Sequence, residues 1–229
     1  PQIAEWEKQR RAAIAPDSPK DGLVGHWEFD GHLADTSGNY RHATVPRGEV
    51  TWAEGPVVRS AVFSGETHAS LGGAADFNSG DAFSLALWIR RSGSNFTVLH
   101  KSDPGRDHRG FDISFDEFIP VPDLRRASHL SFRLIHKWPG SAIVVRTRER
   151  LIQGDWDHIV INYDGSGKAA GVKLFVNGKP YETDVLEDTL AGSFRTSAPL
   201  GIGDKHVARP YKGQIDDLRV YNRQLTVEE

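Results

Sequence analysis

The sequence predicts an all-β protein, a sandwich of two antiparallel sheets with a short helix or linker at its N-terminus. From residue 22 onward apolar and polar residues alternate with a period of two, as in strands that bury one face. Gly, Asn, Asp and Pro recur between these runs, where turns are expected. No later stretch keeps a helical pattern over about ten residues, and no repeat of about 20–50 residues indicates a propeller or solenoid.

The composition fits one globular domain and excludes several classes of protein. Of the 229 residues, 38% are hydrophobic and 10% aromatic, which is enough to build a core. The 28 Lys and Arg against 31 Asp and Glu give a net charge of −3, so we expect no nucleic-acid partner. The absence of Cys excludes disulfides, thiolate catalysis and Cys-ligated zinc. No apolar run approaches about 18 residues, so we expect no membrane span.

The first segment, residues 1–21, differs from the rest of the chain. It is rich in good helix formers until Pro16 ends the pattern. Two interpretations remain open: a linker to an upstream module, or a helix that packs on the domain through Trp6. Because the chain begins at Pro1 and contains no Met, we expect a fragment of a larger, exported protein in which residues 22–229 form the domain.

The alternating runs continue to the end of the chain and predict roughly a dozen to fourteen short strands. The sequence Asn177-Gly178 is a strong hairpin signal, and Asp164-Gly165 marks a second turn. The apolar faces of the main runs are Leu23, Trp27 and Phe29; Phe83, Leu85, Leu87 and Ile89; Phe111, Ile113 and Phe115; Leu130, Phe132 and Leu134; Ile159 and Ile161; Leu174 and Val176; and Leu218 and Val220.

Several segments in this order resemble laminin G-like jelly-roll domains of the concanavalin A-like lectin/glucanase superfamily. They are LVGHWEFDG (23–31), DTSGN (35–39), AVFSG (61–65), FSLALWI (83–89), GDWDHIV (154–160), LFVNGK (174–179), LGIG (200–203) and GQIDDLRVYNR (213–223). The resemblance implies an antiparallel jelly-roll sandwich whose first and last strands pair. Residues 101–150 match the family poorly, and their prolines lead us to expect long loops there, where specificity varies.

The resemblance leaves the function open, because this fold hosts lectins, adhesion modules and glycosidases. We expect a non-catalytic binding module, for carbohydrate first and a protein partner second, in an extracellular, cell-surface or periplasmic protein. The alternatives are a glycoside hydrolase or lyase with an atypical site, and a structural spacer.

Paired carboxylates for sugar hydrolysis are hard to find in the sequence. Asp112 and Asp116 share a strand face, but four residues separate their backbones by roughly 13 Å, too far for either glycosidase mechanism without a bulge. The Glu-x-Asp-x-x-Glu pattern of the family's glucanases is missing. We therefore expect no catalytic site.

A structural calcium site is the metal site that the sequence favours. Calcium takes oxygen ligands from carboxylates, amides and turn carbonyls. Asp30, Asp35 and Asn39 lie in one loop-like segment, and the resemblance brings the last strand, with Asp216, alongside. Asp216 shares the face of Leu218 and Val220 in a regular strand, so we expect an inward carboxylate that needs a partner. The alternative is that Asp30 and Asp35 form Asx turns.

A cluster of basic residues is the candidate ligand surface. Guanidinium groups suit sulfate and carboxylate, and an exposed Trp suits stacking on a sugar ring. An acidic polysaccharide is the ligand these groups fit; the alternative is a solvated sheet face balanced by nearby acids. The candidate residues are Arg133, Trp138, Arg146, Arg148 and Arg150.

Overall fold

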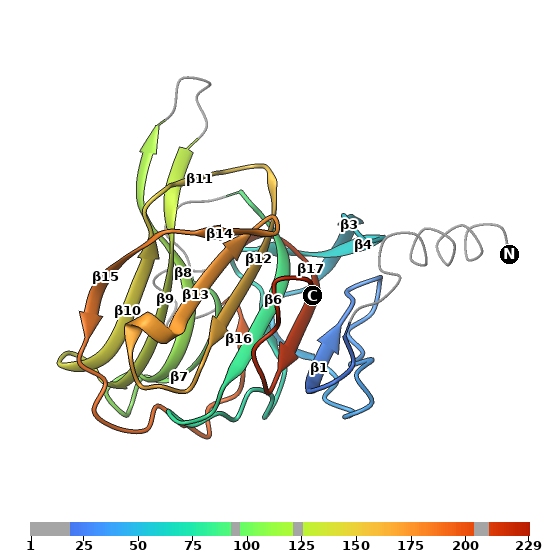
Figure 1. Cartoon of the computed structure of the whole chain (residues 1–229). Coiled ribbons are helices and arrows are strands. Elements are labelled where there is room, and N and C mark those ends of the chain that lie inside the picture. The colour runs from blue at the N-terminus through green and yellow to red at the C-terminus, as the bar shows by residue number, and fades with distance from the viewer. Residues whose placement is uncertain (1–18, 93–96, 121–125, 204–210) are drawn as a thin grey trace, which may run out of the picture.

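The computed structural model describes residues 19–92, 97–120, 126–203 and 211–229. In this part the chain forms two antiparallel sheets packed face to face, which confirms the predicted sandwich (Figure 1). The helix or linker expected over residues 1–21 falls almost wholly outside the described residues. The one described helix is a single 3₁₀ turn, Ala169–Gly171, and no described helix has the length and apolarity needed to cross a bilayer.

The first sheet has eight strands and contains both ends of the described chain. Its order is β14-β13-β12-β6-β17-β4-β3, and β1 pairs with β17. The strands are β1 Leu23–Trp27, β3 Thr51–Glu54, β4 Arg59–Ser64, β6 Phe83–Arg91, β12 Trp156–Tyr163, β13 Val172–Val176, β14 Lys179–Tyr181 and β17 Lys212–Tyr221.

The second sheet has nine strands. Its order is β15-β10-β9-β8-β7-β16-β5-β2, and β11 pairs with β9. The strands are β2 Thr44–Arg47, β5 His68–Ser70, β7 Thr97–Asp103, β8 Arg109–Pro120, β9 Arg126–Lys137, β10 Ser141–Thr147, β11 Leu151–Ile152, β15 Thr183–Asp188 and β16 Gly201–Ile202.

The core lies between the sheets and consists largely of the predicted apolar faces. Leu23 is an exception: a bulge separates it from Gly25, and it packs against a separate cluster of Ala86, Tyr221 and Leu225. The odd-numbered side chains of β6 are fully buried, from Phe83 to Ile89, and they meet the faces of β8 and β9 across the core. Phe83 is an aromatic centre, with ring contacts to Phe111, Phe132 and Tyr163. Burying each such side chain contributes about 2–3 kcal/mol, so the alternation itself selects which face of each strand turns inward.

The pairing of the first and last strands is confirmed. Leu23 pairs with Tyr221 and Trp27 with Leu218. The Asn177-Gly178 hairpin is also confirmed: both residues have positive φ, as a tight two-residue turn requires, and they join β13 to β14. The turn at Asp164-Gly165 follows β12 directly.

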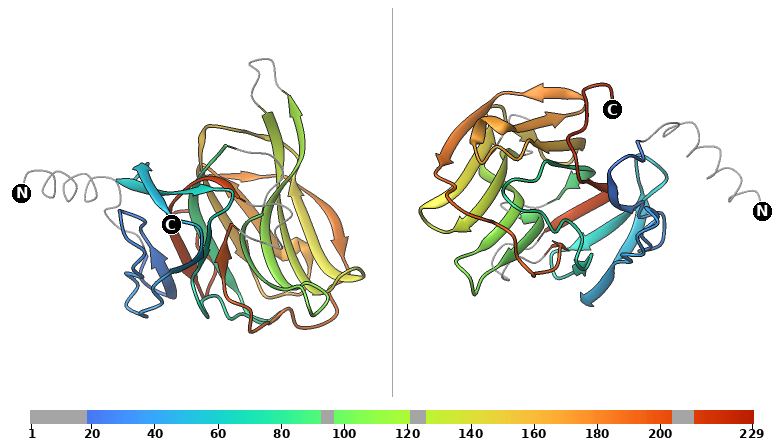
Figure 2. Two further views of the ribbon diagram at one scale, coloured as in Figure 1. Left: turned by 180° about the vertical axis from the view of Figure 1, so that it is seen from behind. Right: turned by 60° about the horizontal axis from the view of Figure 1, so that its bottom comes forward.

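Residues 101–150 are mostly strands, so the expectation of long loops there was wrong. β8 and β9 are each 12 residues long and pair along their length. They extend past the rest of the sandwich as a projecting hairpin (Figures 1 and 2). The described prolines stand at strand ends and turns, and Pro122 lies outside the described residues. Pro120 closes β8, and Pro139 lies in the turn between β9 and β10. Proline cannot donate a ladder hydrogen bond, but it is tolerated at these positions.

Candidate functional site

The predicted basic residues lie on and beside the hairpin of β9 and β10. Arg133 and Arg146 stand on the same outer face of the second sheet, where Arg133 pairs with Val144 and Arg146 with Ser131. β10 ends at Thr147, so Arg148 and Arg150 lie beyond the strand that carries Arg146.

Acidic residues neutralise this face. Arg133 lies 3.6 Å from Asp112 and 3.4 Å from Asp116. Arg146 faces Asp184 at 3.8 Å, and Arg148 bonds to Glu182 and Asp184 at 2.8 and 2.9 Å. Guanidinium groups held in this way have little unbalanced charge for an anionic ligand.

The structure does not bring the whole predicted set together. Trp138 is 40% exposed in the turn before β10, whereas the exposed Arg150 follows the end of that strand. The seven residues of β10 span about 23 Å, too far for one sugar unit to touch both.

Asp112 and Asp116, the two carboxylates considered above as a catalytic pair, form ion pairs with Arg133. Asp112 is fully buried, and the arginine interacts with both carboxylates. A general acid and a nucleophile must both reach a sugar bond, which a fully buried, ion-paired carboxylate does not do.

The four predicted calcium ligands separate into two groups. Asp35 accepts hydrogen bonds from the backbone amides of His26, Ser37 and Arg41. Burial opposes ionisation of Asp35, but these bonds and the Ser37 side chain outweigh it and lower its pKa. The amide of Asn39 donates to the carbonyls of Leu23 and Val24. These two side chains therefore fix the turn between β1 and β2.

Asp30 and Asp216 form the second group, held by the loop between β3 and β4 and by the first residue of β4. Asp30 accepts the backbone amide of Arg59 at 2.8 Å, and Asp216 accepts that of Val57 at 3.0 Å. A Cβ on Gly55 would lie only 2.5 Å from the Asp216 carboxylate, so only glycine allows this loop to approach so closely.

The direction of Asp216 differs from the expectation. A bulge lies between Asp216 and Arg219, and Asp217 has φ of 50°. The extra residue reverses the alternation, so Asp216 pairs with the outward Trp88 instead of sharing the core face of Leu218. The loop covers it, and Asp216 is fully buried all the same.

Asp216 is a buried carboxylate with one unsatisfied oxygen. Its Oδ1 is buried without a hydrogen-bond partner in the described part of the chain. Burial first, and then the nearby charges of Asp217 and Asp30, raise the pKa of Asp216 to about 8. Two neighbouring carboxylates, one with an unsatisfied oxygen, fit a hard cation such as calcium. No group of three or more acids or histidines that could hold a metal occurs among the described residues, so backbone oxygens would have to complete such a site.

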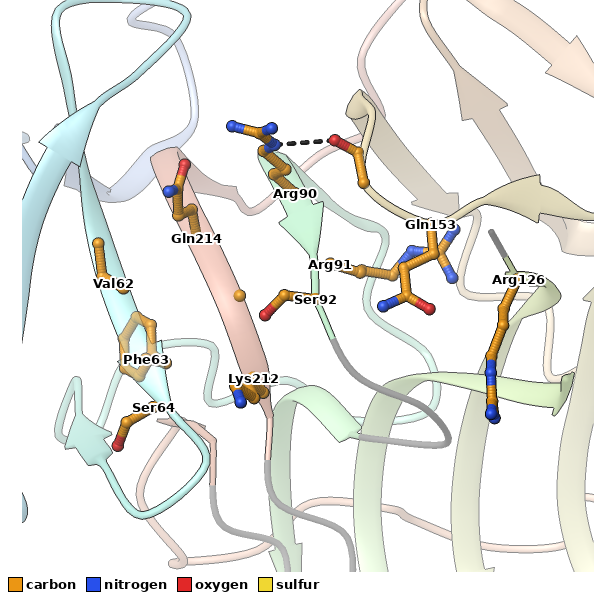
Figure 3. Close-up of a pocket in the computed structure, with 12 residues that line it drawn as sticks. Val62, Phe63, Ser64, Arg90, Arg91, Ser92, Arg126, Gln153, Lys212 and Gln214 are labelled. Carbon is orange, nitrogen blue, oxygen red and sulfur yellow. Dashed lines mark hydrogen bonds between the residues drawn. The ribbon is translucent and has the colours of Figure 1, made fainter. Parts of the chain in front are cut away.

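A pocket that the sequence did not predict lies at one end of the sandwich. It has a volume of about 710 Å³, within the usual range for small-ligand sites. Gln214 and Lys212 of β17 line one side and Arg126 of β9 the other, with Arg91 between them (Figure 3). Arg90 and Gln153 complete its polar wall, and no Asp or Glu is among the described residues that line it.

Arg91 is a buried cation at the base of this wall. Only 1% of it is exposed, and burial lowers its pKa to about 10, while the charge of Asp157 opposes that shift. Its guanidinium donates to Ser128 at 2.6 Å and to the Leu151 carbonyl at 2.8 Å. It also lies 3.9 Å from the centre of the Phe115 ring. These contacts fix its orientation without a direct carboxylate bond among the described residues.

Sequence reasoning missed this pocket because its residues come from separate strands of both sheets. One signal was present. Arg91 continues the alternating series of Phe83, Leu85, Leu87 and Ile89, so a charged residue occupies a position of the strand that faces the core. A buried cation of this kind needs polar partners and marks a special site.

Comparisons with known proteins agree with the fold. Domain 4 of AbnA, an extracellular GH43 arabinanase from Geobacillus stearothermophilus solved with arabinotriose, is 21% identical, with 90% of this chain and 95% of that chain covered and a TM-score of 0.56. The binding domain of Paraclostridial Mosquitocidal Protein 1 is 17% identical, with coverage of 91% and 51% and a TM-score of 0.65. The botulinum neurotoxin serotype G binding domain is 14% identical, with coverage of 90% and 49% and a TM-score of 0.63.

This chain therefore spans about half the length of the two toxin domains. No curated protein matches the sequence. The laminin G family model (Laminin_G_3), described as the concanavalin A-like lectin/glucanases superfamily, matches residues 63–229. β1 and β4, which precede or overlap the start of that match, pair with β17, so they belong to the same sandwich. The strand order, the sheet pairing and this match over most of the chain agree: the protein belongs to the laminin G-like family of the concanavalin A-like lectin/glucanase superfamily.

Proposed function

We propose that this chain is a non-catalytic carbohydrate-binding module. The observation that carries the proposal is the pocket at the end of the sandwich, lined by hydrogen-bonding groups and by no described carboxylate. Guanidinium, amide and hydroxyl groups can bind sugar hydroxyls, whereas glycoside hydrolysis requires a pair of carboxyl groups flanking the bond.

The similar structures support this proposal by analogy of fold. Two are binding domains of toxins, and one is a domain of an extracellular arabinanase in complex with arabinotriose. On the same basis we propose an extracellular, cell-surface or periplasmic location and a place beside other domains in a larger protein.

The proposal is tested by applying the purified chain to a broad array of immobilised glycans, with and without calcium. We expect selective binding of a defined glycan class and no release of reducing ends from the same glycans. Release of reducing ends would move the chain to the glycosidase class. Binding to none of the glycans on the array would overturn the proposal and favour a protein-binding or spacer function.

We also propose that a structural calcium ion sits between Asp30 and Asp216. The buried Oδ1 of Asp216 supports it, because a cation would relieve the cost of burying a carboxylate oxygen that has no hydrogen-bond partner in the described part of the chain. The ion would supply positive charge that holds the loop between β3 and β4 against β17.

A further inference from the structure

We propose that the pocket at the end of the sandwich recognises an anionic group, a carboxylate or sulfate, on the bound saccharide. This inference rests on the proposed function and names the chemical class of its ligand.

The first ground is unbalanced charge. Arg90, Arg126 and Lys212 are exposed at the pocket, and among the described residues none of these side chains has a carboxylate within ion-pair distance. The side chain of Arg90 instead donates to the Gly154 carbonyl at 2.8 Å (Figure 3). The described lining of the pocket holds several cations and no acid, so it attracts an anion despite the net negative charge of the chain.

The second ground is the contrast with the other arginine clusters. Arg133, Arg146 and Arg148 each face one or two carboxylates on the outer face of the second sheet. A solvated basic face is normally balanced in this way. The pocket departs from that pattern, so its charge is left for a ligand.

The third ground is how little aromatic surface the pocket offers. Neutral sugars are commonly held by stacking on an exposed aromatic ring. The aromatic residue in the described lining is Phe63, which is 1% exposed and gives no such platform. Charge and hydrogen bonds must supply the affinity, which favours a charged sugar over a neutral one.

The fourth ground is the buried charge of Arg91, which is 1% exposed and therefore acts on a bound anion through its electrostatic field and not by direct contact. Ser128 and the Leu151 carbonyl fix the Arg91 guanidinium, and the Phe115 ring packs against it. Gln153 and Gln214 stand on either side with amide groups suited to the ring hydroxyls of the sugar (Figure 3). Groups already fixed in place lose little entropy when a ligand binds.

The test compares saccharides that differ only in charge. Oligogalacturonate is titrated against its methyl ester, and dextran sulfate against dextran, by calorimetry at low and high salt. We expect the charged members to bind at least about tenfold more tightly than their neutral partners, and this preference to shrink at about 0.5 M salt.

Variants locate the site. We expect Lys212→Gln and Arg126→Gln each to weaken binding of the charged saccharide by about three- to tenfold, because each removes one charge-assisted contact. The matched control is Arg148→Gln, an exposed arginine that Glu182 and Asp184 neutralise, and it should bind as the wild type does.

The outcomes separate the two proposals. Equal binding of charged and neutral saccharides overturns this inference and leaves the binding module standing. Loss of binding in Arg148→Gln but not in the pocket variants also overturns it and returns the site to the outer face. Failure to bind any saccharide overturns both proposals.

Discussion

At the residue scale, Arg91 and Asp216 are both buried ionisable side chains, but they differ in how far their polar atoms are satisfied. Arg91 is buried with polar partners on its guanidinium, whereas Asp216 is buried with Oδ1 left without one in the described part of the chain. A buried polar group without a partner is costly, so each site indicates what the surroundings must supply. For Asp216 that is a cation or a proton.

Calcium is expected to act through Asp216 and not through Asp35. Millimolar calcium should raise the melting temperature of the wild type, because it binds the folded state selectively. Asp216→Asn should abolish that rise. Asp35→Asn, the control, should lower the melting temperature through lost turn contacts and keep the calcium-dependent rise. Differential scanning fluorimetry with and without chelator measures all three. A rise that survives in Asp216→Asn would exclude this site.

His158 is expected to make stability depend on pH. Burial lowers its pKa, Arg219 lowers it further, and Asp217 opposes the shift. The unfolded chain therefore binds a proton at His158 more readily than the native chain does. The contribution of His158 to the free energy of unfolding is fully present above about pH 6.5 and is lost as the pH drops below it.

Urea unfolding at a series of pH values measures this effect of His158. His158→Gln should flatten the fall below about pH 6.5. The exposed His32→Gln is the control and should keep the wild-type slope. An unchanged slope in His158→Gln would assign the pH dependence to other groups.

At the element scale, contacts between strands of different sheets decide how the end of the sandwich is held. Arg91 of β6 reaches Ser128 of β9 and Leu151 of β11, so one side chain joins the first sheet to two strands of the second. Within the first sheet, the bulge in β17 lies beside Asp216, whose carboxylate accepts the Val57 amide of the loop between β3 and β4.

Replacing Arg91 should loosen this end of the sandwich. Arg91→Met keeps much of the volume but leaves the Leu151 carbonyl and Asp157 without the buried cation. We expect a loss of about 3 kcal/mol in the free energy of unfolding, measured by urea denaturation. Arg90→Met, the neighbouring exposed position, should change it by less than about 0.5 kcal/mol. Comparable losses in the two variants would show that Arg91 has no special role.

At the scale of the whole molecule, two hydrogen bonds link the residues just before the expected boundary at residue 22 to the first strand and to the C-terminal segment. The backbone amide of Leu23 donates to the Lys20 carbonyl, and Arg223 donates to the Asp21 carbonyl. The first strand, β1, thus pairs with the last strand, β17, which also pairs with β4 and β6 in the first sheet.

Two truncations test that boundary. A chain of residues 19–229 should unfold with the same free energy as the full chain, within about 0.5 kcal/mol, because every described contact remains. A chain that starts at residue 30 removes the fully buried Trp27 and Phe29 and should lose at least about 4 kcal/mol. Both are measured by urea unfolding followed by tryptophan fluorescence. A clear loss in the first chain would place residues 1–18 within the domain.

The sequence by itself determined the two-sheet fold, the inward face of most main strands and the hairpin at Asn177-Gly178. These features are encoded locally, since alternation and turn chemistry act over a few residues. The tertiary structure alone decided which charges meet. It neutralised Arg133, Arg146 and Arg148, separated Trp138 from Arg150, and split the calcium candidates so that Asp30 and Asp216 are held by the loop before β4 and by the first residue of β4. It also gathered Arg91, Arg126 and Lys212 from three strands at one pocket. Such contacts depend on register and bulges between segments far apart in the chain, and no local pattern specifies those.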